Sequence, residues 1–138
     1  MIYTLSMLKP DITERKIESD IVKILKDEGF DVLREKKLNL SKQQAEHFYG
    51  AHRERVFFDE LVEYITSGDI VALLLQKDNA VEEHRLLMGA TNPSEAKEGT
   101  IRKNFGLSIC QNSIHGSDSN KSAEKEINFF FGFMDRLK

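Results

Sequence analysis

One histidine stands in a setting that favours chemistry. His115 lies within Asn112–Asp118 (NSIHGSD), after the apolar residue Ile114 and before Gly116. A backbone without a Cβ allows a phosphate group to approach closely. Neutral imidazole is a competent nucleophile near pH 7, because its ordinary pKa of about 6.5 leaves a lone pair on one ring nitrogen. The other nitrogen needs a partner that fixes the tautomer, and Glu126, on a predicted helix, is the candidate carboxylate.

The other three histidines give a weaker signal. His47, His52 and His84 all lie in charge-rich segments with helical patterns, where a partly exposed side chain on a solvated face is expected. Taken alone, a histidine beside a glycine is also more often structural than catalytic. The case for His115 therefore depends on its partners.

Several side chains that could hold a phosphate stand at the ends of predicted elements or in loops. They are Lys9, Arg85, Thr91, Arg102, Lys103 and Asn112. Arginine offers a planar fork of donors that matches phosphate oxygens, and lysine acts as a point charge. A single surface cation is usually only solvated. Lys9 is the exception, because it directly follows an apolar strand and precedes Pro10, so rigid backbone holds it.

Aromatic side chains allow two interpretations. Phe57 and Phe58 are adjacent, so a helix cannot bury both on one stripe, and one could face a cleft and stack on a base. Both could equally be core residues at the start of a helix. Tyr49 is either a core anchor or a hydroxyl turned toward Lys9.

Composition narrows the function classes. The 138 residues carry a net charge of −3 with both signs interspersed, which argues against a general attraction to nucleic acid. No stretch approaches the ~20 apolar residues of a membrane span, and the N-terminus lacks the basic region of a secretory signal. The single Cys110 cannot form an internal disulfide, and Cys/His zinc spacing is absent. A cytoplasmic protein is expected.

The hydrophobic pattern predicts alternating strands and helices over residues 1–138, as one domain. Strands are expected at 2–8, 30–40, 70–75 and 114–117, and helices at 13–28, 57–66, 79–88 and 122–130. A capping box opens a short helix at Ser41, a helical turn starts at Pro93, and 98–105 is expected to be an exposed loop. This order predicts an α+β fold of the ferredoxin-like βαββαβ kind. Its four-stranded antiparallel sheet would be covered on one face, with additional helices.

These residues together resemble the nucleoside diphosphate kinases along essentially the whole chain. The resemblance is carried by these segments: Lys9–Asp11, Tyr49, Phe57–Phe58, Arg85–Pro93, Gly99–Arg102, NSIHGSD, and Ser122–Ile127. The collinear NxxHGSD motif is highly specific. With this motif, the catalytic interpretation of His115 is favoured over the structural one.

The resemblance implies a ping-pong transfer of the γ-phosphate of ATP, or another nucleoside triphosphate, to His115 and then to a nucleoside diphosphate. Glu126 would hydrogen-bond the imidazole nitrogen that is not phosphorylated. Asn112, with Lys9, would contact the sugar, and Tyr49 would help position the lysine. The remaining implied contacts are the phosphate clamp of Lys9, Arg85, Thr91 and Arg102, and the pinching of the base between Phe57 and Ile109.

The resemblance also implies cofactor and assembly. Mg²⁺ would arrive on the nucleotide phosphates without direct protein ligands, and Asp118 could touch its water shell. Stacking tolerates any base, so broad base specificity is expected. A homo-oligomer is implied, and hexamer or tetramer stays open because the chain ends at Lys138. Departures from the family pattern at Ile12, Val56, Cys110 and Gln111 concern loop geometry and the shape of the base site.

Two alternatives of other classes compete with the enzyme. A domain that binds RNA across its sheet would need aromatic-rich strands and a basic face, which 2–8 and 70–75 do not show. A nucleotide sensor would keep the clamp but has no use for a nucleophile. The presence of both His115 and Glu126 disfavours it.

Overall fold

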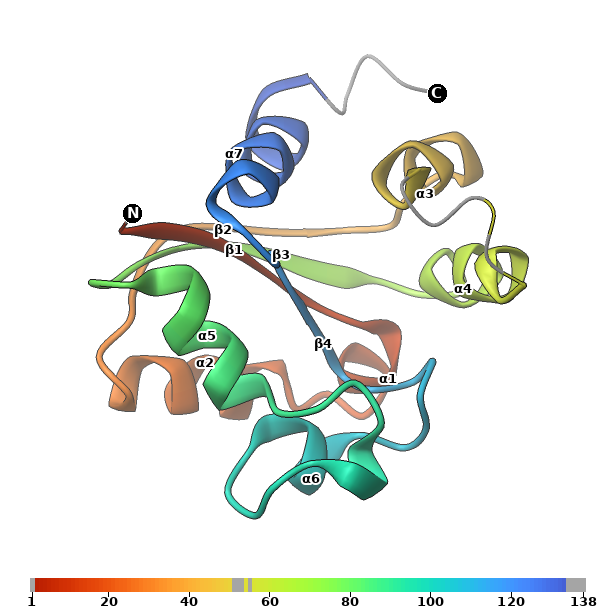
Figure 1. The fold of residues 1–138 in the computed structure, drawn as a ribbon. Helices are drawn as coiled ribbons and strands as arrows, with labels where there is room; N and C mark the ends of the chain where they lie inside the picture. Colours follow the sequence, from red (N-terminus) through yellow and green to blue (C-terminus); the bar gives the residue numbers. More distant parts are fainter. Residues whose placement is uncertain (1, 51–53, 55, 134–138) are drawn as a thin grey trace.

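The computed structural model describes residues 2–50, 54 and 56–133 of the chain, and Figure 1 shows its fold. Four strands form one sheet in the order β2-β3-β1-β4, and every neighbouring pair is antiparallel. The strands are β1 (Tyr3–Leu8), β2 (Asp31–Leu38), β3 (Ile70–Gln76) and β4 (Ile114–Gly116). The α+β class and the four-stranded antiparallel sheet are therefore confirmed. The 70–75 run is an interior strand, as its continuous apolar character predicts.

Helices cover both faces of this sheet, so the expectation of one covered face is wrong (Figure 1). One face packs against α3 (Lys42–Phe48), α4 (Phe58–Ile65) and α7 (Asn120–Asn128). The other packs against α1 (Pro10–Glu14), α2 (Glu18–Asp27), α5 (Ala80–Met88) and α6 (Ile101–Phe105). The additional helices supply the second layer.

Alternation along the strands explains why two cores form. In β1, Leu5 and Met7 belong to the core under α3, α4 and α7, and Leu8 belongs to the core under α1, α2 and α5. In β3, Ala72 and Leu73 likewise face opposite sides. Successive side chains of a strand point to opposite faces, so an interior strand that is apolar throughout needs cover on both.

The predicted helix over 13–28 is two helices, which corrects that expectation. α1 begins at Pro10 and ends at Glu14, and α2 begins at Glu18. Between them Lys16 has a φ of 57°, in the left-handed region that a right-handed helix cannot include. Residues 13–16 are all polar, and the apolar residues that predicted the helix begin at Ile17, so the pattern located α2 but not the break before it.

The segment 98–105, expected to be an exposed loop, contains the helix α6. Thr100 caps it, because its hydroxyl accepts a hydrogen bond from the Lys103 backbone N–H at 3.3 Å. Ile101 and Arg102 are both buried. A threonine cap followed by an apolar residue was the signal in the sequence, and the polar composition of the segment hid it.

The other cap signals are confirmed. At the start of α3, Ser41 Oγ accepts from Gln44 N at 3.1 Å, and Gln44 Oε1 accepts from Ser41 N at 2.9 Å. Asn92 caps a 3₁₀ turn, η2 (Pro93–Glu95), by accepting from Ser94 N at 3.1 Å. The helix α7 begins at Asn120 and continues into a π-helical segment, η3 (Phe129–Phe133).

None of the helices in the described residues combines the length and the apolar character that a membrane span requires.

His84 is fully buried, which corrects the expectation of a solvated side chain. It lies on α5 under the sheet, where Nε2 pairs with Ser6 Oγ at 2.9 Å and the ring meets Phe30 edge to face. Burial, and then the nearby charges of His115, Arg102 and Arg85, lower the pKa of His84 to about 3. Its ring is therefore neutral in the folded protein at ordinary pH. His52 lies outside the described residues.

This buried ring predicts acid sensitivity. Below pH 6.5 the unfolded chain protonates His84 while the folded chain does not, so the stabilisation present above pH 6.5 is lost as the pH falls toward 3. Between pH 7 and pH 5 this one group should remove on the order of 2 kcal/mol from the free energy of unfolding. Urea titrations of the wild type and of His84→Gln at both pH values measure it. The variant should lose about that much less on acidification, and equal losses would contradict the prediction.

Candidate active site

The predicted site residues line one cleft of about 1020 Å³. Its lining comes from the end of β1, from α3, α4, α5, α6, β4 and α7, and from the segments 89–92 and 108–112. The lining includes every predicted catalytic and binding residue: Lys9, Tyr49, Phe57, Arg85, Thr91, Arg102, Ile109, Asn112, His115 and Glu126. Side chains drawn from seven separate parts of the chain thus converge in space. Lys103, the remaining candidate cation, is exposed and does not belong to this lining.

The strand register places His115 in the cleft. β4 pairs with β1 so that His115 is opposite Met7, and opposite residues share a face of the sheet. That face carries α3, and His115 accordingly packs edge-on to Phe48, with ring centroids 5.1 Å apart, and to Tyr49, at 6.2 Å. The ring is partly exposed, so it is both fixed and accessible. Phe48 was not predicted as a neighbour of the nucleophile.

Glu126 contacts one ring nitrogen of His115, the candidate nucleophile. His115 Nε2 lies 2.9 Å from Glu126 Oε1, and that oxygen also accepts a hydrogen bond from Ser117 Oγ at 2.7 Å. The carboxylate keeps the proton of the neutral ring on Nε2, which leaves the lone pair on Nδ1. Ser117, two residues after His115 and on the same face, was missed although it is part of the quoted motif.

Gly116 has a packing role that the sequence did not suggest. A Cβ there would lie 2.3 Å from His84 Nδ1 and 2.8 Å from Met88 Sδ. The glycine therefore makes room for the buried α5 side chains on the opposite face from His115. It also lines the cleft, so close approach of a ligand to its backbone remains compatible with its position.

Lys9 is buried at the end of β1 and is linked to the predicted sugar contact. Its Nζ donates to Asn112 Oδ1 at 2.8 Å and to the Cys110 carbonyl at 3.4 Å. Asn112 Nδ2 in turn donates to the Thr91 carbonyl at 2.9 Å. Three residues far apart in sequence are thereby fixed relative to one another.

Burial, followed by the charge of Arg102, lowers the pKa of Lys9 to about 8. The ammonium is still mostly protonated at pH 7, and an anion bound beside it would favour the charged form. This group is thus a cation with an incomplete set of partners.

Arg102 supports the site and faces it. Its Nη1 donates to the Gly89 carbonyl at 3.0 Å and its Nη2 to the Ile114 carbonyl at 2.8 Å. These bonds join α6 to the end of α5 and to β4, next to His115. Burial and the charge of Arg85 lower the pKa of Arg102 to about 10, so the guanidinium stays charged. Arg85 is exposed on α5.

Phe57 and Phe58 lie in different environments, as the interpretation with one ring facing a cleft predicted. Phe58 is buried in the core at 6% exposure, whereas Phe57 is 44% exposed and lines the cleft. Ile109, at 59% exposure, also lines it. Tyr49 is buried against His115, and burial raises the pKa of its phenol, which stays protonated. Lys9 Nζ donates hydrogen bonds to Asn112 and to the Cys110 carbonyl, so positioning of Lys9 by Tyr49 stays a prediction.

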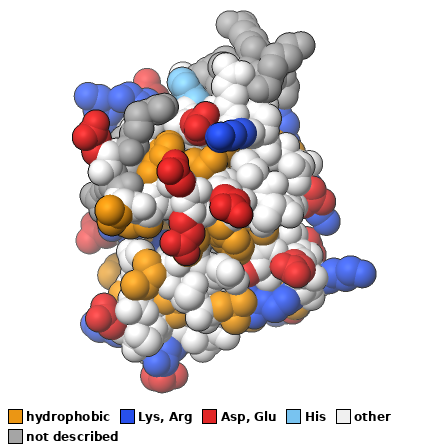
Figure 2. All heavy atoms as spheres, turned by 90° about the vertical axis from the view of Figure 1, so that its right-hand side faces the viewer, with side chains coloured by type: hydrophobic (Ala, Val, Ile, Leu, Met, Phe, Trp, Pro, Cys, Tyr) orange, Lys and Arg blue, Asp and Glu red, His pale blue; other side chains and the backbone are white. Residues whose placement is uncertain are grey.

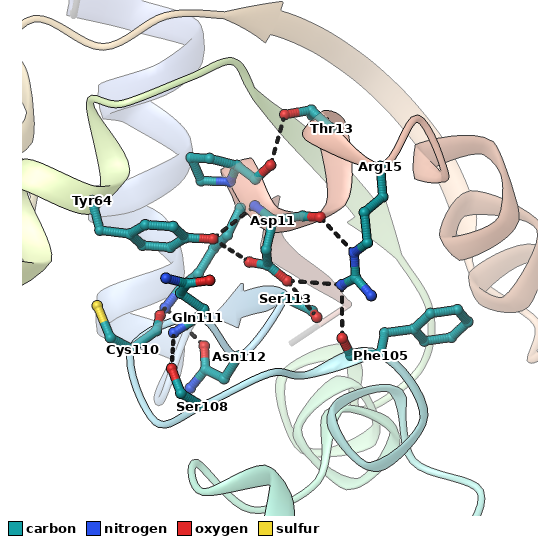
Figure 3. Close-up of polar contacts among 12 residues, drawn as sticks. Asp11, Thr13, Arg15, Tyr64, Phe105, Ser108, Cys110, Gln111, Asn112 and Ser113 are labelled. Carbon is teal, nitrogen blue, oxygen red and sulfur yellow. Dashed lines mark hydrogen bonds and ion pairs between the residues drawn. The ribbon is translucent and has the colours of Figure 1, made fainter.

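A buried carboxylate that sequence reasoning missed braces the segment before β4 (Figure 3). Asp11 accepts from Tyr64 OH, from Ser113 Oγ at 2.8 Å and from Arg15 Nη2 at 3.1 Å. Its own backbone N–H donates to Tyr64 OH at 2.7 Å. Ser113 adopts a φ of 74°, an unfavourable value for a residue with a side chain. The carboxylate thus ties α1 and α4 to the residue beside Asn112.

This arrangement is that of a phosphotransferase: an α+β domain in which a histidine with one free nitrogen faces converging cations. The family profile described as nucleoside diphosphate kinase matches residues 3–135. The chain belongs to the nucleoside diphosphate kinase family.

Comparison with individual relatives supports this family assignment. The nucleoside diphosphate kinase of Lawsonia intracellularis is 47% identical over 138 residues, which cover all of both chains. The crystal structure of the Encephalitozoon cuniculi nucleoside diphosphate kinase superimposes with a TM-score of 0.92 at 36% identity, covering 96% of this chain and 90% of that one. The halophilic enzyme from Halobacterium salinarum, solved in complex with CDP, gives 0.91 at 37% identity, covering 99% and 90%.

The brace at Asp11 can be tested through Tyr64. Tyr64→Phe removes the acceptor of the Asp11 N–H and one donor to its carboxylate, which should cost about 1–3 kcal/mol of unfolding free energy. Tyr3→Phe is the matched control, because Tyr3 is 37% exposed at the start of β1. Urea unfolding compares the two. Equal stabilities for the two variants would show that the Tyr64 hydroxyl does not brace the segment.

Proposed function

We propose that this chain is a nucleoside diphosphate kinase that works through a phosphohistidine on His115. Family membership supports the reaction, and one observation supports the mechanism. The 2.9 Å contact of His115 Nε2 with Glu126 occupies one ring nitrogen and leaves Nδ1 as the nucleophile. The ring also lines the cleft from which a polyphosphate would approach.

The transfer has two balanced halves. Nδ1 of His115 attacks the γ-phosphorus of a nucleoside triphosphate, the bond from that phosphorus to the β,γ-bridging oxygen breaks, and the nucleoside diphosphate leaves. A terminal oxygen of a second nucleoside diphosphate then attacks the phosphorus, and the N–P bond breaks. Glu126 stabilises the positive charge that the ring carries while the N–P bond forms and breaks.

The cations and polar groups fit the roles assigned to them from the family. Lys9, Arg85, Thr91 and Arg102 would bind the phosphates, and these four line the same cleft as His115. Phosphoryl transfer requires mainly positioning and charge neutralisation, which such a set supplies. Asn112, held by Lys9 and Thr91, would contact the sugar.

A divalent cation fits this chemistry as part of the nucleotide. Among the described residues no group of three or more His, Cys, Asp or Glu side chains could hold a metal ion. Asp118 lines the cleft, and a hydrogen bond from Ser122 lowers the pKa of its carboxyl, so it is available for contact through water. Mg²⁺ bound to the phosphates would neutralise part of their charge.

The wider setting follows the family. We propose a cytoplasmic homo-oligomer, hexamer or tetramer, acting on ATP and other nucleoside di- and triphosphates as a single domain. Exposed apolar side chains such as Ile2, Leu33 and Leu86 are available for subunit contacts. An RNA-binding sheet is disfavoured, because such a sheet needs an open face and both faces here carry helices.

The nucleophile can be identified by labelling. With γ-labelled ATP and magnesium the protein should acquire a label that acid removes and base does not, and a nucleoside diphosphate should discharge it. His115→Ala should acquire none. His47→Ala, in which an exposed histidine on α3 is removed, should label like the wild type. A label that survives acid, or that persists in His115→Ala, would refute the phosphohistidine.

The role of Glu126 can be separated from nucleotide binding. Removing the carboxylate in Glu126→Ala should slow labelling by about 10- to 100-fold, because the ring loses its fixed tautomer and orientation. Affinity for ADP should change little. Glu124→Ala removes an exposed acid from the same helix and is the control. Rapid-quench labelling and nucleotide titration measure the two quantities, and a parallel loss of both in Glu126→Ala would assign Glu126 a structural role only.

A further inference from the structure

One acidic side chain lines the cleft away from the proposed chemistry. Glu60 lies on α4, three residues after Phe57, and both line the cleft with Leu61. Residues three and four apart share one face of a helix, and the Leu61 N–H to Phe57 carbonyl bond of 2.9 Å shows that helical geometry already holds at Phe57. The carboxylate of Glu60 is therefore beside the aromatic ring proposed to stack on the base.

The opposite wall brings a second part of the chain to the same place. Ser108, Ile109 and Cys110 line the cleft facing α4. Glu60 lines the same cleft as this segment. Burial raises the pKa of the Cys110 thiol, the charge of Lys9 lowers it and the charge of Glu60 raises it. Glu60 thus belongs to the cleft-lining face of α4, with Phe57 and Leu61, in the part of the cleft that would hold a base.

Glu60 has unused hydrogen-bonding capacity. It is exposed, and with the residues that the structure describes it forms no hydrogen bond or ion pair, so both oxygens are available as acceptors. The view that looks onto the right-hand side of Figure 1 shows acidic side chains gathered among hydrophobic ones (Figure 2). The acidic residues of α4 are Asp59, Glu60 and Glu63, and of these three only Glu60 lines the cleft.

Charge separation along the cleft fixes which end of a nucleotide meets Glu60. Lys9 and Arg102 are buried cations at the end that contains His115. A carboxylate repels phosphate and attracts N–H donors. A nucleotide bound with its phosphates at the cations would therefore present its base to Glu60.

We propose that Glu60 reads the Watson–Crick edge of the bound base and makes the site prefer guanine. This inference rests on the proposed function. Guanine presents two donors side by side, N1–H and the N2 amino group, which match the two oxygens of a carboxylate. Adenine presents one donor, N6, beside the N1 lone pair, which a carboxylate repels. Stacking on Phe57 does not distinguish guanine from adenine, so the selectivity between the two bases depends on Glu60.

The test uses substitutions that change the pattern of donors and acceptors. Wild type should bind GDP about five-fold more tightly than ADP, with IDP, which lacks the N2 amino group, in between. Glu60→Ala should bring the GDP/ADP ratio to about one. Glu60→Gln should shift the ratio toward ADP, because an amide offers one donor and one acceptor, the complement of the adenine edge. Glu63→Ala, an exposed acid on the same helix, should keep the wild-type ratio.

Dissociation constants are measured by displacement of a fluorescent nucleotide, and turnover is measured separately with each acceptor. Identical GDP/ADP ratios in wild type, Glu60→Ala and Glu60→Gln would overturn the inference. So would an equal change in Glu63→Ala, because that would indicate general electrostatics. If binding ratios follow the prediction while no acceptor discharges a labelled protein, the base reading holds and the proposed kinase function fails.

Discussion

The site depends on the pairing of a three-residue strand with the strand at the centre of the fold. β4 contributes only Ile114, His115 and Gly116, and each pairs with one residue of β1. Side chains alternate between faces, so this register sends His115 toward Glu126 and Gly116 toward His84. A slip of one residue would exchange these environments. The backbone before β4 is therefore held from several sides, by the Lys9 N–H to the Ser113 carbonyl and by the contacts of Arg102 and Asp11.

The burial of two cations at one end of the cleft costs folding stability but places them where a polyphosphate would bind. Desolvation opposes the charge of both Lys9 and Arg102, as their lowered pKa values show. Backbone carbonyls and the Asn112 amide compensate part of this cost. In the proposed reaction a polyphosphate would supply negative charge beside these cations. The same groups that are costly to bury would then neutralise the charge that develops in the transition state of phosphoryl transfer.

Sequence reasoning succeeded where local chemistry decides the structure. Ser41 and Asn92 show that cap signals hold, and the strand before Lys9 ends where the sequence predicts. It failed where contacts between distant segments decide. His84 is buried because Ser6, on a distant strand, offers a partner. Most of the residues lining the cleft were named as candidates from their types and positions, but their assignment to one nucleotide site came from the family resemblance, because no local pattern reveals convergence in space.

The two ends of the cleft differ in how tightly the fold constrains them. At the phosphate end Lys9, Asn112 and Arg102 are buried and joined to backbone from three elements, so changing one disturbs both binding and folding. At the base end Phe57 and Ile109 are largely exposed, and each touches the ligand space from a single segment. Substitutions there cost little stability. The chemistry is thereby fixed by the core, whereas base selectivity is free to vary with surface residues of α4 and of the 108–110 segment.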